Sequence, residues 1–116
     1  MLESASSARI VFTTVASPEE AARMGRALVE EHLAACATFF PSAHSIYRWQ
    51  GQIESSAETL LLLKTVSDRL PALEARLHEL HSYQTPEFLA IAVDAGSHQY
   101  LAWLCACLDA GSEASA

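Results

Sequence analysis

The chain has 116 residues, which is long enough for one domain to bury a hydrophobic core without disulfides or a structural metal. Hydrophobic residues make up 51% of the chain and charged residues 18%, a composition that excludes an intrinsically disordered protein. The formal net charge of −7 argues against binding to a phosphate backbone, so we expect no nucleic-acid partner.

The N-terminal residues lack the apolar segment of a signal peptide, and no apolar run is long enough to cross a membrane. We therefore expect no membrane partner. Residues 1–8 are predicted to form a flexible leader, 9–109 a single domain and 110–116 a flexible tail. The three cysteines are odd in number and lack disulfide-framework spacing, which predicts reduced thiols and a cytoplasmic location.

A short apolar strand is predicted at residues 10–15, followed at once by helix-start signals. Ser17 is a good N-cap, Pro18 suits the first helical position, and Glu20 completes a capping box with Ser17. The helical pattern then continues to about His32.

Two long strands follow, at residues 34–49 and 52–65, and Gln50-Gly51 forms a tight turn between them. Fifteen extended residues would span about 50 Å, whereas a compact domain of this length is about 35 Å wide. The first strand must therefore bend, for which Pro41 is suited, or extend beyond its own domain. Such a hairpin usually contacts another subunit, and Trp, Tyr and Arg dominate buried contacts between chains. The predicted interface residues are Tyr47, Arg48 and Trp49.

Asp68 begins a second predicted helix, with Pro71 in its first turn. This helix should end near His81, because Pro86 favours extended backbone before it. A strand is predicted at residues 87–93, a turn at 94–96, and a last helix that begins after Ser97. The order β-α-β-β-α-β plus a C-terminal helix predicts an α+β, ferredoxin-like fold.

The densest polar cluster is the segment from His81 to Glu87, at the end of a helix and the start of a strand. Imidazole and carboxylate together could bind Cu²⁺ or Zn²⁺ weakly. Alternatively, His81 offsets the negative end of the helix and Glu87 is a solvated residue at the start of the strand. Lys64 is either an exposed charge at a strand end or a cation in a pocket near Glu87.

No catalytic triad, phosphate loop or metalloprotease motif is present, so we expect neither an enzyme nor an organic cofactor. Cys105 and Cys107 are two apart on a helix and therefore do not share a face.

Several segments, in order and with little room for insertions, identify the chain as similar to the CutA family of divalent-cation tolerance proteins. They are Leu33-Ala34-Ala35-Cys36-Ala37, Ser45-Ile46-Tyr47-Arg48-Trp49-Gln50-Gly51, Leu63-Lys64-Thr65, His81-Ser82-Tyr83-Gln84-Thr85-Pro86-Glu87 and Tyr100-Leu101 with Trp103.

The resemblance implies a homotrimer in which the long hairpins pack against neighbouring subunits. It nominates His81 and Glu87 as ligands of a divalent metal ion, with copper as the leading candidate. The residues of the implied intersubunit cleft are Trp49, Lys64, Tyr83, Tyr100 and Trp103. The chain departs from the family at Ser82, where proline is usual, and at Thr13-Thr14, where some members have a copper-binding cysteine. Without that thiolate, a weak Cu²⁺ or Zn²⁺ site is expected.

Two other functions remain open. One is a trimeric signalling or scaffold protein, similar to PII-type transducers, that holds a small anion beside Lys64. The other is an enzyme with His81 as acid or base, for which no nucleophile or cofactor motif is visible.

Overall fold

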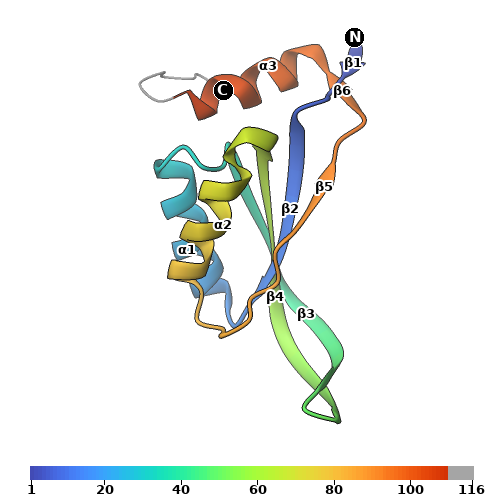
Figure 1. Cartoon of the computed structure of the whole chain (residues 1–116), viewed down its shortest axis with the longest axis vertical. Helices are drawn as coiled ribbons and strands as arrows, with labels where there is room; N and C mark the ends of the chain where they lie inside the picture. Colours follow the sequence, from blue (N-terminus) through green and yellow to red (C-terminus); the bar gives the residue numbers. More distant parts are fainter. Residues whose placement is uncertain (110–116) are drawn as a thin grey trace.

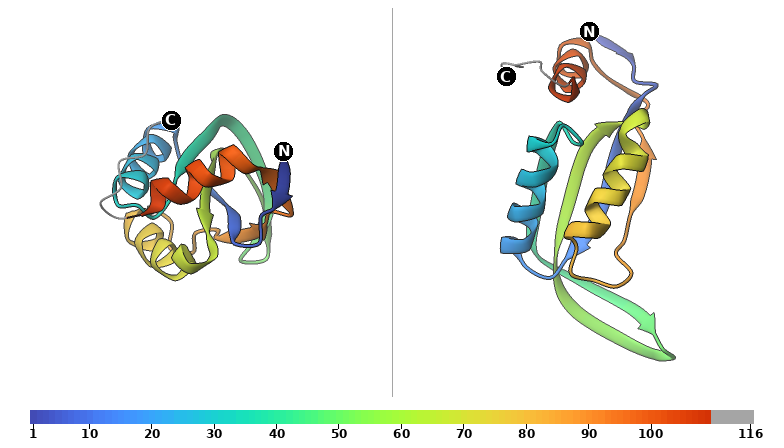
Figure 2. Two further views of the ribbon diagram at one scale, coloured as in Figure 1. Left: turned by 90° about the horizontal axis from the view of Figure 1, so that it is seen from above. Right: turned by 60° about the vertical axis from the view of Figure 1, so that its left-hand side comes forward.

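The structure is a computed structural model that describes residues 1–109. A four-stranded sheet has two helices on one face and a third helix across one end (Figures 1 and 2). A short 3₁₀ turn, Ser67–Arg69, precedes the second helix. The main elements are β2 (Ala8–Val15), α1 (Pro18–Glu30), β3 (Cys36–Trp49), β4 (Gln52–Val66), α2 (Leu70–Leu80), β5 (Leu89–Ala92) and α3 (His98–Leu108). The predicted ferredoxin-like fold with an added C-terminal helix is confirmed.

The strands of the main sheet lie in the order β3-β4-β2-β5, and every neighbouring pair is antiparallel. The connection through α1 passes over β4, and the connection through α2 passes over β2, which is the split βαβ arrangement. Val11 on β2 lies opposite Leu63 on β4 and Ala90 on β5. Antiparallel partners point to the same face of a sheet, so this register assigns each side chain to a face.

The hydrophobic core lies between the sheet and the helices α1 and α2. Its fully buried side chains are Val11, Val15, Ala21, Met24, Leu28, Leu61, Leu63, Leu73 and Leu77. On the opposite face, Leu89 is paired with Phe12 and remains 62% exposed, and Ile91 and Phe40 are also exposed. Among residues 1–109, this apolar face therefore stays exposed to solvent. An exposed apolar face of this kind is typical of a contact with another chain.

The molecule measures 47 × 27 × 24 Å, and the β3–β4 hairpin extends past the rest of the domain along the longest axis (Figure 1). Gln50 and Gly51 both have positive φ, at 50° and 80°, as a two-residue hairpin turn requires. The bend predicted at Pro41 is present as a register shift between Phe40 and Ala43, with Ser42 at φ 67°. Both features confirm the sequence prediction.

The starts of α1 and α3 were predicted correctly, whereas α2 begins at Leu70, two residues after the predicted Asp68, which lies in the 3₁₀ turn. The Ser17 hydroxyl accepts a hydrogen bond from the Glu20 N–H at 3.1 Å, and the Ser97 hydroxyl accepts one from the Tyr100 N–H at 3.2 Å. The helix α2 ends immediately before His81, as expected. The strand β5 begins at Leu89, two residues later than predicted.

The first residues of the predicted leader form a short strand. Leu2–Ser4 forms β1, which pairs with β6 (Ala95–Ser97) where a turn was expected. The His98 N–H donates to the Met1 carbonyl at 2.8 Å, and the Ala5 N–H donates to the Asp94 carbonyl at 3.1 Å. Strands of three residues, held by backbone hydrogen bonds, leave no periodic pattern in the sequence.

The predicted tail, residues 110–116, lies outside the described residues. Among residues 1–109, no helix is long and apolar enough to cross a membrane.

Candidate functional site

A cavity of about 630 Å³ lies between the hairpin and the loop that leads into β5. Trp49, Tyr83 and Glu87, three of the residues nominated from the sequence, line this cavity. The remaining lining residues are Thr14, Ser45, Ile46, Tyr47, Glu58, Gln84 and Thr85. The structure therefore brings part of the predicted cleft together within one chain.

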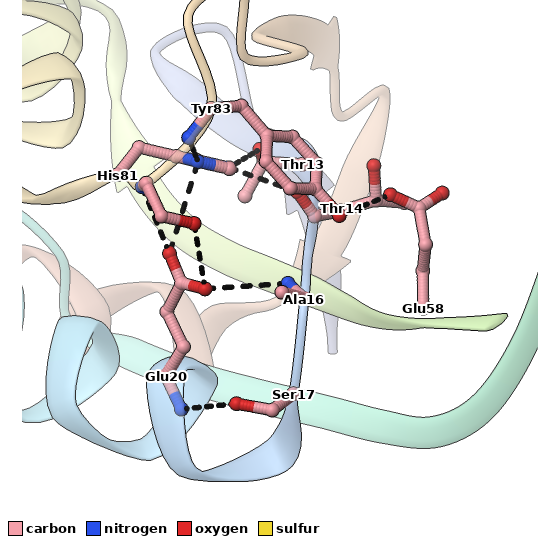
Figure 3. Close-up of polar contacts among 9 residues, drawn as sticks. Thr13, Thr14, Ala16, Ser17, Glu20, Glu58, His81 and Tyr83 are labelled. Atoms are coloured by element: carbon pink, nitrogen blue, oxygen red, sulfur yellow. Dashed lines mark hydrogen bonds and ion pairs between the residues drawn. The ribbon is translucent and has the colours of Figure 1, made fainter. Parts of the chain in front are cut away.

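Glu58 on β4 is the most enclosed acid of the cavity, with only 8% of the residue exposed. The Tyr83 hydroxyl donates a hydrogen bond to Glu58 Oε2 at 2.7 Å (Figure 3). Burial, this hydrogen bond and the charge of Glu58 raise the pKa of Tyr83. Tyr83 is therefore a fixed donor that holds the Glu58 carboxylate at the cavity wall.

Glu87 is the second acid of the cavity. Partial burial and the negative charge of Glu58 raise the pKa of Glu87 above its ordinary value. Two carboxylates that repel each other are stabilised by a cation placed near both. This pair gives the cavity a preference for positive charge.

His81 lies behind the cavity wall and does not line the cavity as it is formed by residues 1–109. Its side chain is fully buried. Nε2 lies 2.8 Å from the Thr14 carbonyl, to which it donates, and 3.4 Å from the Thr13 hydroxyl. Nδ1 accepts the Tyr83 N–H at 3.1 Å (Figure 3). Both ring nitrogens have protein partners, and His81 does not line the cavity with Glu87, so the predicted His81–Glu87 ligand pair stays a prediction.

Glu20 of α1 anchors the same loop from the other side (Figure 3). Its carboxylate accepts hydrogen bonds from the Ser82 N–H and hydroxyl, both at 3.0 Å, and from the Ala16 N–H at 3.3 Å. His81 Nδ1 lies 3.8 Å away. Burial raises the pKa of Glu20, but the hydrogen bonds from Ser82 and Ala16 outweigh burial and leave the pKa lowered. Ser82, the residue that departs from the family pattern, supplies two of these bonds.

The other predicted cleft residues form a separate cluster near α3. Lys64 Nζ donates to the Tyr100 hydroxyl at 3.3 Å and lies 5.5 Å from the centre of that ring. The rings of Tyr100 and Trp103 are 5.4 Å apart, and Trp103 Nε1 is buried with no hydrogen-bond partner in the described residues. Lys64 is six residues from Glu58 along β4, a separation of about 20 Å. One chain therefore does not place Lys64 beside Glu87.

The three predicted interface residues lie near the end of the hairpin. Tyr47 and Trp49 line the cavity and keep 43% and 49% of their surface exposed. The Tyr47 hydroxyl lies 3.2 Å from the Ser56 hydroxyl. Arg48 is exposed and pairs with Ile53, so it points to the opposite face of the ribbon.

Sequence reasoning missed Glu58 as a site residue and assigned Glu20 only to helix capping. Glu58 follows Ser55-Ser56-Ala57 and stands directly before the buried segment of β4. An acidic residue at the edge of a buried strand segment is the signal in the sequence that could have identified Glu58 as a site residue. Among residues 1–109, no three His, Cys, Asp or Glu side chains are grouped as a metal site. Cys36, Cys105 and Cys107 are free cysteines in the structure.

Comparisons with known proteins agree on one family. The family model described as "CutA1 divalent ion tolerance protein" matches residues 9–107. The divalent-cation tolerance protein CutA of Thermus thermophilus is 45% identical over 95 residues, which cover 82% of this chain and 92% of that protein. Human protein CutA is 39% identical over 93 residues, and the match covers 80% of this chain and 52% of the human protein. This chain thus spans about half the length of its human relative.

Solved structures give the same result. The structure of CutA from Synechococcus elongatus has a TM-score of 0.90 and 37% sequence identity, and the match covers 94% of this chain and 96% of that one. The family model and the solved structure of a relative therefore both match nearly all of the described residues. The chain belongs to the CutA family of divalent-cation tolerance proteins.

Proposed function

We propose that this chain is a homotrimeric protein that binds divalent cations, Cu²⁺ first, and acts in divalent-cation tolerance through that binding. Glu58 and Glu87, two acids in one cavity, are the observation that carries the proposal. The proposed role is binding and not catalysis, and the proposed location is cytoplasmic, in keeping with free thiols at all three cysteines.

The proposed ligands are the carboxylates of Glu58 and Glu87, so that Glu58 replaces His81 in the pair suggested by the sequence. Carboxylate oxygens are accepted by both Cu²⁺ and Zn²⁺. Burial and, after it, repulsion by Glu58 raise the pKa of Glu87, and a bound metal would neutralise that repulsion. Because residues 1–109 supply only two such carboxylates to the cavity, the affinity should be weak.

The trimer is supported by two apolar surfaces that the domain leaves exposed. One is the sheet face that carries Leu89 and Ile91, and the other is the hairpin, where Ile46 is 75% and Ile53 61% exposed. Apolar areas of this kind mark contacts between subunits. In such an assembly, a neighbouring subunit would lie beside the cavity and could supply further ligands.

A calorimetric titration with Cu²⁺ tests the proposed ligands. Glu87→Gln and Glu58→Gln should each weaken copper binding by about tenfold or more, because each removes one charged ligand and keeps the side-chain shape. Glu54→Gln is the matched control. Glu54 lies on β4, as Glu58 does, and carries the same charge, but it is exposed and does not line the cavity. Unchanged copper affinity in both cavity variants would contradict the proposal.

A second candidate is a trimeric signalling module that holds a small anion. The observation in its favour is the cluster of Lys64, Tyr100 and Trp103, which offers an ammonium group and a buried indole N–H without a partner in residues 1–109. A buried donor of this kind normally has an acceptor. This function needs no metal, so a trimer that takes up no copper would favour it.

A further inference from the structure

Two of the three cysteines lie where α3 meets the start of β3. Cys36 is the first residue of β3, Cys107 lies in the last turn of α3, and both are half-buried. The last turns of α3 lie against the loop that joins α1 to β3, and two views agree on this (Figures 1 and 2). Neither thiol lines the cavity of the proposed cation site, so that site gives them no role.

Hydrogen bonds hold the end of α3 on this loop. The His32 Nδ1–H donates to the Cys107 carbonyl at 3.0 Å, and His32 lies in the loop that leads into β3. The Arg69 guanidinium donates to the His32 carbonyl and to the Leu108 carbonyl. These contacts join the last turn of α3 to the loop, so they fix Cys107 close to the start of β3.

Apolar packing places the two cysteines on the same contact. Ala35, directly before Cys36, forms a buried cluster with Leu104 and Leu108 of α3, and Cys107 packs against that cluster. Residues three apart, such as Leu104 and Cys107, lie on the same side of a helix. Cys107 therefore faces the domain beside the residue that precedes Cys36.

The direction of the Cys36 side chain agrees with this placement. Cys36 is paired with Lys64, and antiparallel partners point to the same face of a sheet. Lys64 donates a hydrogen bond to the Tyr100 hydroxyl, so the face that carries Cys36 also contacts α3. Burial, and after it the negative charge of an ionised Cys36, raise the pKa of the Cys107 thiol. A like charge has this effect only from a short distance, so the two thiols are neighbours.

We propose that Cys36 and Cys107 form a reversible disulfide when the protein meets hydrogen peroxide, and that this bond joins α3 covalently to β3. Both thiols belong to one chain, so the bond needs no residue of a neighbouring subunit. In a cytoplasmic protein, a disulfide of this kind is typically transient and responds to oxidation.

The reaction balances with peroxide as the oxidant. Cys36 Sγ attacks one peroxide oxygen, the O–O bond breaks, and the products are a sulfenic acid and water. Cys107 Sγ then attacks the sulfenic sulfur, which forms the S–S bond and releases the sulfenic oxygen as a second water. The two thiol protons leave in these waters. Cys107 reacts second, because burial keeps it protonated and the thiolate is the nucleophile.

Peroxide treatment of the full chain, followed by alkylation and peptide mapping without reductant, tests the inference. All samples contain EDTA, so that peroxide is the only oxidant. We expect a link between Cys36 and Cys107 that dithiothreitol reverses, with Cys105 alkylated. Cys105 is the matched control, because it is exposed on the same helix. Cys105→Ser should keep the link, and Cys107→Ser should abolish it.

The thermal midpoint is a second readout. The bond closes a long loop of the chain, so oxidation should raise the midpoint by about 5 °C or more. The rise should also appear in Cys105→Ser and be absent in Cys107→Ser. A link that uses Cys105 would overturn the inference, and so would thiols that stay free or are oxidised further without a link.

Discussion

Replacing Glu20 by alanine should lower the free energy of unfolding by about 3 kcal/mol, because the change leaves buried donors without an acceptor. The Ser82 N–H and hydroxyl and the Ala16 N–H all donate to this carboxylate. Urea unfolding measures the change. Glu19→Ala is the matched control, since Glu19 is exposed in the same helical turn, and it should change stability by no more than about 0.5 kcal/mol.

The same residue gives a pH dependence with a defined sign. The pKa of Glu20 in the folded chain is below the ordinary value of 4.5, so the unfolded chain binds the proton more tightly. The contribution of Glu20 to stability is therefore complete above about pH 5 and decreases as the pH falls through the folded-state pKa. The difference in stability between the native chain and Glu20→Gln should decrease over that acidic range. A difference that grows on acidification would contradict the proposed network.

Replacing Trp49 by aspartate should dissociate the proposed trimer and lower its thermal midpoint. Trp49 is 49% exposed in the single chain, at the end of a hairpin that extends past its own domain (Figure 1). A tryptophan at the centre of an interface contributes strongly to association, and an unpaired carboxylate in its place would cost several kcal/mol to bury. Analytical ultracentrifugation over a range of protein concentrations measures the effect.

Gln52→Asp is the matched control for the hairpin. Gln52 is exposed and is the pairing partner of Trp49 in the hairpin. The substitution introduces the same negative charge as Trp49→Asp but removes no aromatic side chain. This variant should remain a trimer. A Trp49→Asp protein that stayed trimeric and equally heat-resistant would show that the hairpin does not hold the subunits together.

The fold was predictable wherever a local signal and the global arrangement agree. Gly51 in the hairpin turn, Pro41 at the bulge and Ser17 at the start of α1 each have a backbone requirement that the residue type reveals. The pairing of β1 with β6 was missed, because it depends on backbone groups 91 to 95 residues apart and buries few side chains.

The site was predictable only in part, because residue type does not reveal which hydrogen bonds are already made. His81 has the chemistry of a metal ligand, but the Thr14 carbonyl and the Tyr83 N–H occupy its two nitrogens. Glu58 is distant in sequence from the loop at residues 81–87, yet the Tyr83 hydroxyl donates to its carboxylate in the folded chain. Both facts arise from tertiary packing, which spacing along the chain does not encode.

A native mass spectrum of the full chain, before and after a slight excess of Cu²⁺, tests the central claim most directly. We expect a trimer that gains up to one specific copper per subunit, with the gain lost in Glu87→Gln and retained in Glu54→Gln. A trimer without specific copper uptake would contradict the metal site, and a monomer would contradict the assembly on which the whole account depends.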